Sequence, residues 1–290
     1  MDLCRTLLFV PGNRQRMLDR APRSGADIIV ADLEDAVPAG EKREARRMVR
    51  ALVAGAGESG ARVFVRVNNV HTGLARGDLM EVVRAGLAGV VHPKTDHAQD
   101  LRDLDVLLRE AELRNKVRPG DVAVVPLIET PRAILRCEEI ARATDRVAAL
   151  SLGGEDYTAE LGVARSDEAL AYARGVIVTV AAATGVPAID TPYPAIDDER
   201  GLLRETRLAS AMGFRGKYVI HPGQVGSVNA VFSPTAEDVA AARRIVEAAR
   251  RAEKQRKGSV ALDGRMIDAP IVERARRLLE TAERIANGGA

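Results

Sequence analysis

Two stretches of the sequence share one pattern: VAVVPLIETP, residues 122–131, and VAALSLGGED, residues 147–156. Each is an apolar run that ends in acidic residues, first Glu129 and then Glu155 and Asp156. Near-continuous apolar runs of this kind predict strands that are covered on both faces, as in a parallel sheet. The acids therefore follow directly on buried strands, and parallel α/β folds place their chemistry at the carboxyl ends of strands.

The same alternation runs through most of the chain, where short apolar runs are separated by longer segments with helical periodicity. The predicted strands are 6–10, 26–34, 62–68, 89–94, 122–129, 147–152, 187–191 and 217–222, and the predicted helices include 40–54, 97–114, 130–143, 167–184 and 200–212. Eight strand–helix units predict an α/β fold, a (β/α)8 TIM barrel. Periodicity alone leaves a doubly wound open sheet as the alternative, but no G-x-G-x-x-G motif follows the first strand.

The pattern changes after residue 225. Residues 234–254 place Val239, Ala242, Ile245, Val246 and Ala249 on one helical face. A charged, glycine-bearing segment follows, and residues 270–286 then form a second amphipathic helix whose Pro270 suits a first turn. We expect a TIM-barrel catalytic domain over residues 1–225 and a C-terminal helical extension and lid over residues 226–290.

Composition excludes several classes of protein. Of the 290 residues, 46% are hydrophobic and 29% charged, as in ordinary globular proteins. The two cysteines, Cys4 and Cys137, stand alone, which argues against a disulfide framework or a zinc site and favours the cytoplasm. No apolar run reaches the roughly 20 residues of a membrane span. Local arginine clusters leave a nucleotide- or RNA-binding protein as a rival class, although the net charge is only +2 and aromatic residues make up 3%.

Polar side chains stand at the end of every predicted strand. They are Arg14, then Asp32, Glu34 and Asp35, then Arg66 and Asn68, His92 and Lys94, Glu129, Glu155 and Asp156, Asp190, and His221. A single acid in such a position often only caps the next helix. Because eight polar strand ends converge on one rim of a barrel, we expect an active site there.

Glu129 and Asp156 lie on adjacent predicted strands. Two neighbouring carboxylates raise each other's pKa unless a cation lies between them. Oxygen ligands favour Mg²⁺, which usually keeps several positions for water and substrate. The sequence therefore predicts a magnesium site at Glu129 and Asp156.

Seven motifs in order carry a family resemblance: LFVPGNR, DLEDAV, FVRVNN, PKT, PLIETP, GGEDYT and GKYVIHPGQ. Together they resemble the citrate lyase β-subunit-like family of the HpcH/HpaI aldolase group, near the malyl-CoA and citramalyl-CoA lyases. The resemblance implies a TIM barrel that uses Mg²⁺, acts on 3-hydroxyacyl thioesters and assembles as trimers or multiples of them.

The resemblance also implies roles for individual residues. Glu129 and Asp156 would bind the metal, and Arg66 would hold the carboxylate and keto oxygen of the substrate; with Glu155 these form the expected substrate-binding set. Coenzyme A would contact Phe9, Arg14, Arg20, Ile220 and His221, of which the last two are at the thioester end. Lys94 and Asp32 would support these groups from behind, and Gly153 and Gly154 would let backbone amides approach the substrate.

Asp268 lies in the segment LDGRMIDAP between the two C-terminal helices. One interpretation is that it caps the helix starting near Pro270. The resemblance implies instead that it is the general acid/base, delivered from a neighbouring subunit.

These implications define a Mg²⁺-dependent carbon–carbon lyase that cleaves or forms malyl-CoA or citramalyl-CoA, with glyoxylate or pyruvate as the 2-oxo acid. A citrate lyase β subunit acting on a carrier-protein thioester and a malyl-CoA thioesterase are the alternatives. No nucleic acid or membrane partner is expected.

Overall fold

The computed structural model describes residues 3–59, 62–254, 260–262 and 265–287. Eight parallel strands form a closed barrel in chain order, and β1 pairs with β8 to close it. The strands are β1 (Thr6–Pro11), β2 (Ile28–Asp32), β3 (Arg62–Arg66), β4 (Leu87–His92), β5 (Ala123–Ile128), β6 (Leu150–Leu152), β7 (Ala188–Asp190) and β8 (Gly216–Val219). The predicted TIM barrel is confirmed, and each predicted strand is present with its ends shifted by a few residues.

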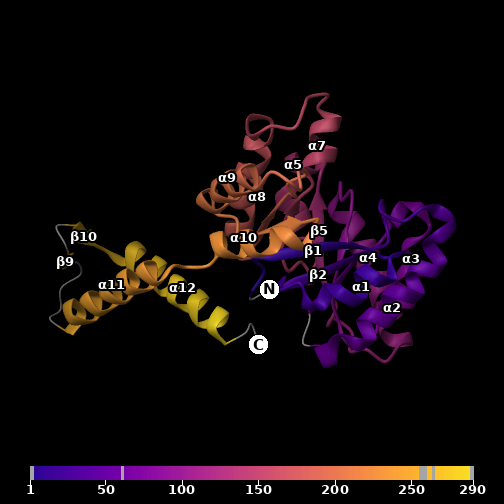
Figure 1. Cartoon of the computed structure of the whole chain (residues 1–290), viewed down its shortest axis with the longest axis horizontal. Coiled ribbons are helices and arrows are strands. Elements are labelled where there is room, and N and C mark those ends of the chain that lie inside the picture. The colour runs from indigo at the N-terminus through magenta and orange to yellow at the C-terminus, as the bar shows by residue number, and fades with distance from the viewer. Residues whose placement is uncertain (1–2, 60–61, 255–259, 263–264, 288–290) are drawn as a thin grey trace. The chain divides into compact units, whose positions relative to one another are not determined.

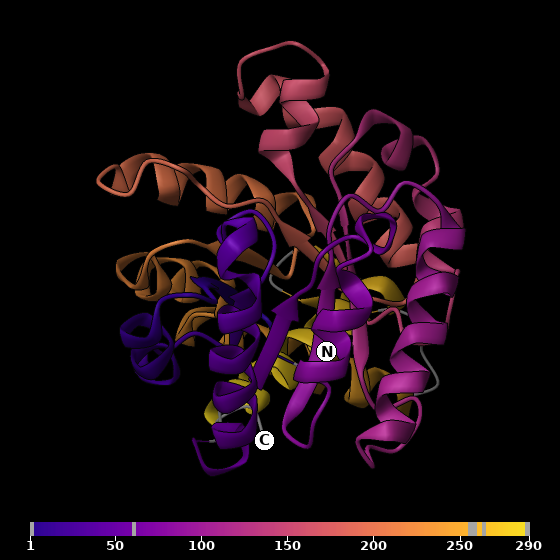
Figure 2. The same ribbon diagram turned by 90° about the vertical axis from the view of Figure 1, so that its right-hand side faces the viewer.

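Helices surround the strands of the barrel (Figures 1 and 2). They are α1 (Gln15–Arg20), α2 (Lys42–Ser59), α3 (Ala75–Val82), α4 (Ala98–Arg114), α5 (Pro131–Leu135), α6 (Cys137–Ala141), α7 (Gly154–Glu160), α8 (Asp167–Thr184), α9 (Glu199–Met212) and α10 (Pro222–Phe232). The predicted helix 130–143 is two helices, because Arg136 leaves helical geometry at φ −115° and ψ 13°. No helix in the described ranges is both long and apolar enough for a bilayer crossing.

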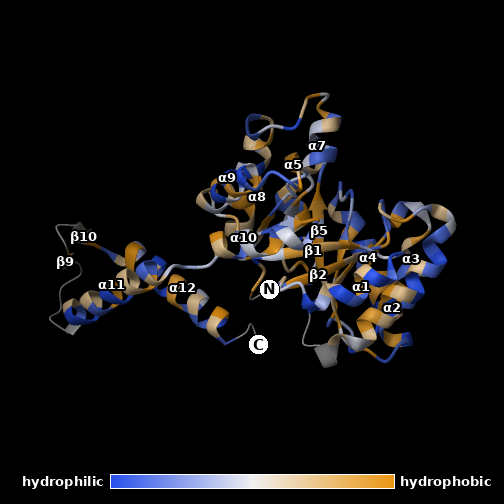
Figure 3. Cartoon of the chain, in the orientation of Figure 1, coloured by the Kyte–Doolittle hydropathy of each residue, from blue (hydrophilic) through white to orange (hydrophobic). Residues whose placement is uncertain are grey.

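The barrel interior is built mainly from aliphatic side chains, as a chain without tryptophan requires. Its buried cluster consists of Cys4, Leu7, Ile28, Val30, Phe64, Val91, Val125, Leu127, Ala149, Ile189 and Tyr218. Figure 3 shows strands that are mainly hydrophobic, surrounded by helices that carry both hydrophobic and hydrophilic residues. Buried side chains of this kind are close-packed, so the residues at the strand ends stand on a rigid base.

The strand register decides which polar ends become neighbours. Asp32 at the end of β2 is the direct partner of Arg66 at the end of β3. β4 and β5 are in register with His92 opposite Pro126. Because all eight strands run the same way, their carboxyl ends form one rim.

The residues from Ala230 onward form a second compact unit, and Leu3–Asn229 form the first. The division falls within α10 (Pro222–Phe232). The second unit contains α11 (Ala236–Lys254), β9 (Val260–Leu262), β10 (Arg265–Ile267) and α12 (Ala269–Ala286), with β9 and β10 antiparallel. Its own small core consists of Ala242, Val246 and Ala275, packed with Ile245, Leu278 and Leu279.

Candidate active site

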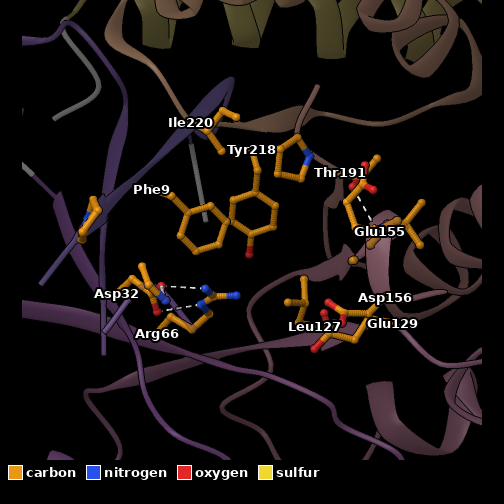
Figure 4. A pocket seen from close by; sticks show the side chains of 16 residues that line it. Phe9, Asp32, Arg66, Leu127, Glu129, Glu155, Asp156, Thr191, Tyr218 and Ile220 are labelled. Carbon is orange, nitrogen blue, oxygen red and sulfur yellow. Dashed lines mark hydrogen bonds and ion pairs between the residues drawn. The ribbon is translucent and has the colours of Figure 1, made fainter. Parts of the chain in front are cut away.

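A cavity of about 300 Å³ lies at the carboxyl ends of the barrel strands. Six strands, all except β4 and β7, contribute residues to its lining, and further lining residues directly follow strands. The lining is Phe9, Pro11, Asp32, Ala36, Arg66, Leu127, Glu129, Leu152, Gly153, Gly154, Glu155, Asp156, Thr191, Pro192, Tyr218 and Ile220. Figure 4 shows the acids Glu129 and Asp156 on one side and the Arg66–Asp32 pair on the other. Six of the predicted site residues therefore share one cavity: Phe9, Arg66, Glu129, Glu155, Asp156 and Ile220.

Glu129 and Asp156 lie next to each other in this cavity (Figure 4). Glu129 follows β5 and is only 2% exposed, whereas Asp156 is exposed in the first turn of α7. Burial, and then the charge of Asp156, raise the pKa of Glu129 to about 8. The pair is thus unfavourable when both groups are ionised, and a bound cation would remove that cost.

The oxygen atoms of these two carboxylates are ligands of the kind that magnesium prefers. Within the described residues, no three His, Cys, Asp or Glu side chains are grouped so that they could hold a metal ion. A site with two protein carboxylates leaves the other ligand positions to water and substrate oxygens, which is how Mg²⁺ is usually bound. The chemistry of the two acids and the raised pKa of Glu129 therefore agree with the predicted ion.

Backbone packing fixes the position of Glu129. Its Oε1 accepts a hydrogen bond from the Lys94 backbone N–H at 2.6 Å. Gly153 lies against its other oxygen, where a Cβ atom would come within 2.3 Å of Oε2. The N–H of Gly153 bonds to the Ile128 carbonyl and that of Gly154 to Thr191 Oγ1, so neither is free for a substrate as had been expected. These glycines instead make room for Glu129 and Thr191.

Arg66 is held in a fork with Asp32. Its Nε and Nη2 donate to the two Asp32 oxygens at 2.7 and 2.6 Å. Nη1 lies 3.1 Å from Glu34 Oε2, but that buried oxygen has no aligned hydrogen bond. Burial would lower the pKa of Arg66, yet the hydrogen bonds and charge of Asp32 raise it above its usual value. A guanidinium has five N–H donors, so Arg66 keeps donors for a second anion in the cavity.

The cavity also has an apolar wall. Phe9 and Tyr218 stack at 4.7 Å between ring centroids, and the Arg66 guanidinium lies 4.9 Å above the Phe9 ring. The Tyr218 hydroxyl donates to Ser151 at 3.2 Å. The polar strand ends alone did not predict Tyr218 as a site residue, although its place in KYVIHP, two residues before the expected Ile220, was the available signal.

The predicted coenzyme A arginines lie elsewhere. Arg14 and Arg20 line a second, separate hollow of about 570 Å³ on and beside α1, together with Asn13, Gln15, Arg16 and Met17. Arg16 thus adds a third cation that the prediction did not include. His221 is exposed and its Nδ1 accepts from the Gly223 N–H; it does not line either cavity.

Several other polar strand ends have structural partners. Asp190 is fully buried and pairs with Arg174 and Lys217, so it lies outside the cavity lining. His92 is fully buried against Thr95, and burial lowers its pKa to about 4. Glu155 does line the cavity and forms an ion pair with Arg165 at 3.0 Å, a partner that the sequence did not suggest.

Asp268 is the N-cap of α12. Its Oδ1 accepts from the Ile271 N–H at 3.4 Å, a long capping bond. The capping interpretation is thus present within the second unit, and a catalytic role for the same side chain stays a prediction.

The protein is a closed parallel barrel, and one rim of it carries an acid pair, a buried arginine and an apolar wall. This combination is typical of a TIM-barrel enzyme. The chain belongs to the HpcH/HpaI aldolase/citrate lyase family, whose profile matches residues 5–222, and it is a lyase of that family.

Individual relatives match along nearly the whole chain. Citrate lyase subunit beta of Haemophilus influenzae is 40% identical over 98% of both chains. The mitochondrial citramalyl-CoA lyase of Homo sapiens is 33% identical over 97% of this chain and 86% of its own. The crystal structure of CitE from Mycobacterium tuberculosis in complex with magnesium, acetoacetate and coenzyme A has a TM-score of 0.78 and 30% identity, over 97% of this chain and 98% of the other.

Proposed function

We propose that this chain is a Mg²⁺-dependent lyase that cleaves or forms the carbon–carbon bond of a 3-hydroxyacyl-CoA, with malyl-CoA or citramalyl-CoA as substrate. The products are a 2-oxo acid, glyoxylate or pyruvate, and an acyl-CoA. The observation that carries the proposal is the acid pair in the cavity, with Glu129 buried and its pKa raised to about 8 in part by Asp156. The named relatives support it, because one is a citramalyl-CoA lyase and another was crystallised with magnesium and coenzyme A.

Each side of the cavity has a task in this reaction. Glu129 and Asp156 would hold the cation, which would supply positive charge to stabilise oxygens that become more negative as the bond breaks. Arg66, already oriented by Asp32, binds the substrate carboxylate with its remaining donors. The Phe9–Tyr218 wall keeps water from that side of the reacting carbons. Phe9 and Ile220 then lie towards the thioester, while Arg14 and Arg20 attract the coenzyme phosphates.

A proton donor for the acyl product is still needed, and none of the acids in the cavity is free for that task. We assign it to Asp268 of a neighbouring subunit in a homotrimer or a multiple of one. Support comes from its place between β10 and α12, in the segment next to the exposed Met266.

A citrate lyase β subunit is the second candidate, and the 40% identity to the Haemophilus influenzae protein favours it. In that case the thioester would be carried by a protein, and α1 would face the carrier rather than free coenzyme A. The two candidates share the acid pair and Arg66, so the site alone does not separate them.

A substrate panel separates the candidates. The protein is incubated with acetyl-CoA or propionyl-CoA and with glyoxylate, pyruvate or oxaloacetate, each with Mg²⁺ and with EDTA, and products are identified by mass. Product formation from free coenzyme A esters that stops in EDTA supports the lyase proposal. Activity that requires a carrier protein would favour the citrate lyase β subunit, and activity undiminished in EDTA would refute the metal site.

A further inference from the structure

Lys94 has an unusual backbone conformation. Among the residues that the structure describes, Lys94 (φ +47°) and Lys116 (φ +58°) are the non-glycine residues with a positive φ. A side chain with a Cβ atom is disfavoured in this left-handed region, and β-branched side chains are the most disfavoured. Lys116 is exposed just after α4, whereas Lys94 lies in the turn after β4, beside the acid pair.

Buried hydrogen bonds hold the Lys94 turn in place. The Asn69 side-chain amide donates to the carbonyls of both Pro93 and Lys94, each at 3.0 Å. Thr95 is fully buried, and its hydroxyl donates to the His92 carbonyl at 2.9 Å. Its backbone N–H bonds to Leu127 of β5. The surrounding protein therefore imposes the conformation on Lys94, and strain of this kind is concentrated at functional sites.

The two ends of Lys94 serve different partners. Its backbone N–H donates to Glu129 Oε1 at 2.6 Å, while Gly153 confines the other Glu129 oxygen. The ammonium group points away, to an ion pair with Glu34 and a longer one with Asp35 at 3.4 Å. The contact with Glu129 thus depends on the backbone geometry of residue 94 and not on the chemistry of its side chain.

We propose that the left-handed turn at Lys94 is a positioning device for Glu129, in which the backbone N–H of Lys94 fixes the carboxylate for cation binding and Asn69 holds the turn. The inference rests on the proposed function, since it takes Glu129 as a cation ligand. Groups that orient a metal ligand from behind typically change metal affinity by about 10–100-fold when they are altered.

Two substitutions at one position separate backbone from side chain. Lys94→Asn and Lys94→Val both remove the ammonium group, but asparagine tolerates the left-handed region and valine does not. We expect Lys94→Val to bind Mn²⁺ at least about tenfold more weakly than Lys94→Asn, measured by isothermal titration calorimetry on metal-free protein. Asn69→Ala leaves residue 94 unchanged and loosens the turn, so it should also weaken Mn²⁺ binding, and it keeps the test open if Lys94→Val does not fold.

Matched controls lie outside the site. Lys116→Val and Lys116→Asn repeat the comparison at an exposed residue with a positive φ, and Asn115→Ala removes the hydrogen bond that the Asn115 side-chain amide donates to the Met80 carbonyl. These controls should change the melting temperature and leave the Mn²⁺ dissociation constant unchanged.

The outcomes are distinct. Equal Mn²⁺ affinity for Lys94→Val and Lys94→Asn, with wild-type affinity in Asn69→Ala, would overturn the positioning role while leaving the proposed function in place. If both Lys94 variants bind Mn²⁺ equally and much more weakly than the wild type, the ammonium group and not the backbone turn supports cation binding, and the positioning role is overturned. A wild-type protein that binds no Mn²⁺, or binds it unchanged after Glu129→Gln, would refute the cation site and this inference together.

Discussion

Gly153 leaves the space that the Glu129 carboxylate occupies: a Cβ atom at position 153 would lie 2.3 Å from Glu129 Oε2 and 2.4 Å from Glu129 Cβ. The two residues come from the ends of neighbouring strands, β6 and β5. A methyl group here would force Glu129 away from the Lys94 N–H and out of reach of a shared cation.

We therefore expect Gly153→Ala to lower kcat/KM by about 100-fold, because a displacement of the order of an ångström has that effect on a catalytic group. Gly175→Ala is the control, since a Cβ atom there meets nothing within 4 Å. It lies inside α8, where alanine should raise the free energy of unfolding by about 0.5–1 kcal/mol without changing the kinetics. Normal kinetics for Gly153→Ala would show that Glu129 has no fixed role.

The Glu129 pKa predicts how the metal-free protein responds to pH. The pKa in the folded state, about 8, lies above the ordinary value of 4.5, so folding favours the protonated acid. This contribution to stability is fully present below pH 4.5 and is lost as the pH rises through 8. Glu129→Gln should therefore unfold at a higher temperature than the wild type at pH 8.5, and the difference should shrink towards pH 5.

Added Mg²⁺ should reverse that order, because a ligand that binds only the folded state stabilises it. The wild type should gain melting temperature with Mg²⁺ at pH 8, and Glu129→Gln should not. Scanning calorimetry with and without EDTA measures both effects. Equal gains in the two proteins would place the ion elsewhere.

The fold could be predicted from the sequence because its signal is repeated eight times. Runs such as VAVVPLIE are apolar enough to predict buried strands, and TIM barrels are the common solution for eight of them. The acids after β5 and β6 were predicted to be neighbours for the same reason, and Glu129 and Asp156 do line one cavity. Where strands pair in chain order, residues at the ends of consecutive strands become neighbours in space, so the sequence predicts which of them lie close together.

The pairing of individual side chains could not be predicted, since it depends on register and on rotamers. Asp190 is the last residue of β7 and Glu129 directly follows β5, yet Asp190 is neutralised within the core by Lys217 and Arg174. Lys94 was expected to support the site groups from behind, and the structure shows that it contacts Glu129 through its backbone N–H. A left-handed lysine has no signature in a single sequence, because the contacts that impose it come from Asn69 on another loop.

Arg66→Lys tests the anion-binding proposal. Lysine keeps the charge but loses the fork that bonds both Asp32 oxygens and leaves donors for a substrate. We expect a loss of about 100-fold in kcat/KM, as for the removal of one positioned electrostatic group. Steady-state kinetics with glyoxylate and with pyruvate measure it.

Arg5→Lys is the matched control, because Arg5 makes the same forked contact with Asp27 just before β1 and β2. It should lower stability and leave kcat/KM unchanged. If Arg66→Lys behaves like Arg5→Lys, the role of Arg66 is structural.

His92 makes the barrel sensitive to acid. Burial lowers its pKa from 6.5 to about 4, so its contribution to stability is present above pH 6.5 and is lost as the pH falls through 4. The shift corresponds to about 3 kcal/mol. Urea unfolding of the wild type between pH 7 and pH 4 should therefore show a steeper loss of stability than that of His92→Asn. Parallel pH curves for the two proteins would contradict the buried neutral imidazole.

The substitution Asp268→Asn distinguishes a helix-capping role of Asp268 from a catalytic one. As the N-cap of α12 it accepts a hydrogen bond from the Ile271 N–H, and asparagine caps helices about as well as aspartate. Asp268→Asn should thus keep the melting temperature and the binding of oxo acid and coenzyme A, and should lose carbon–carbon chemistry because an amide cannot transfer the proton.

If Asp268 acts across a subunit boundary, mixing Asp268→Asn with Asp156→Asn under conditions of subunit exchange should restore part of the activity, since some sites then receive both wild-type residues. Native mass spectrometry confirms that the mixed oligomers have formed. Mixed oligomers without activity would refute delivery from a neighbouring subunit, and a fully active Asp268→Asn would leave the residue as a helix cap alone.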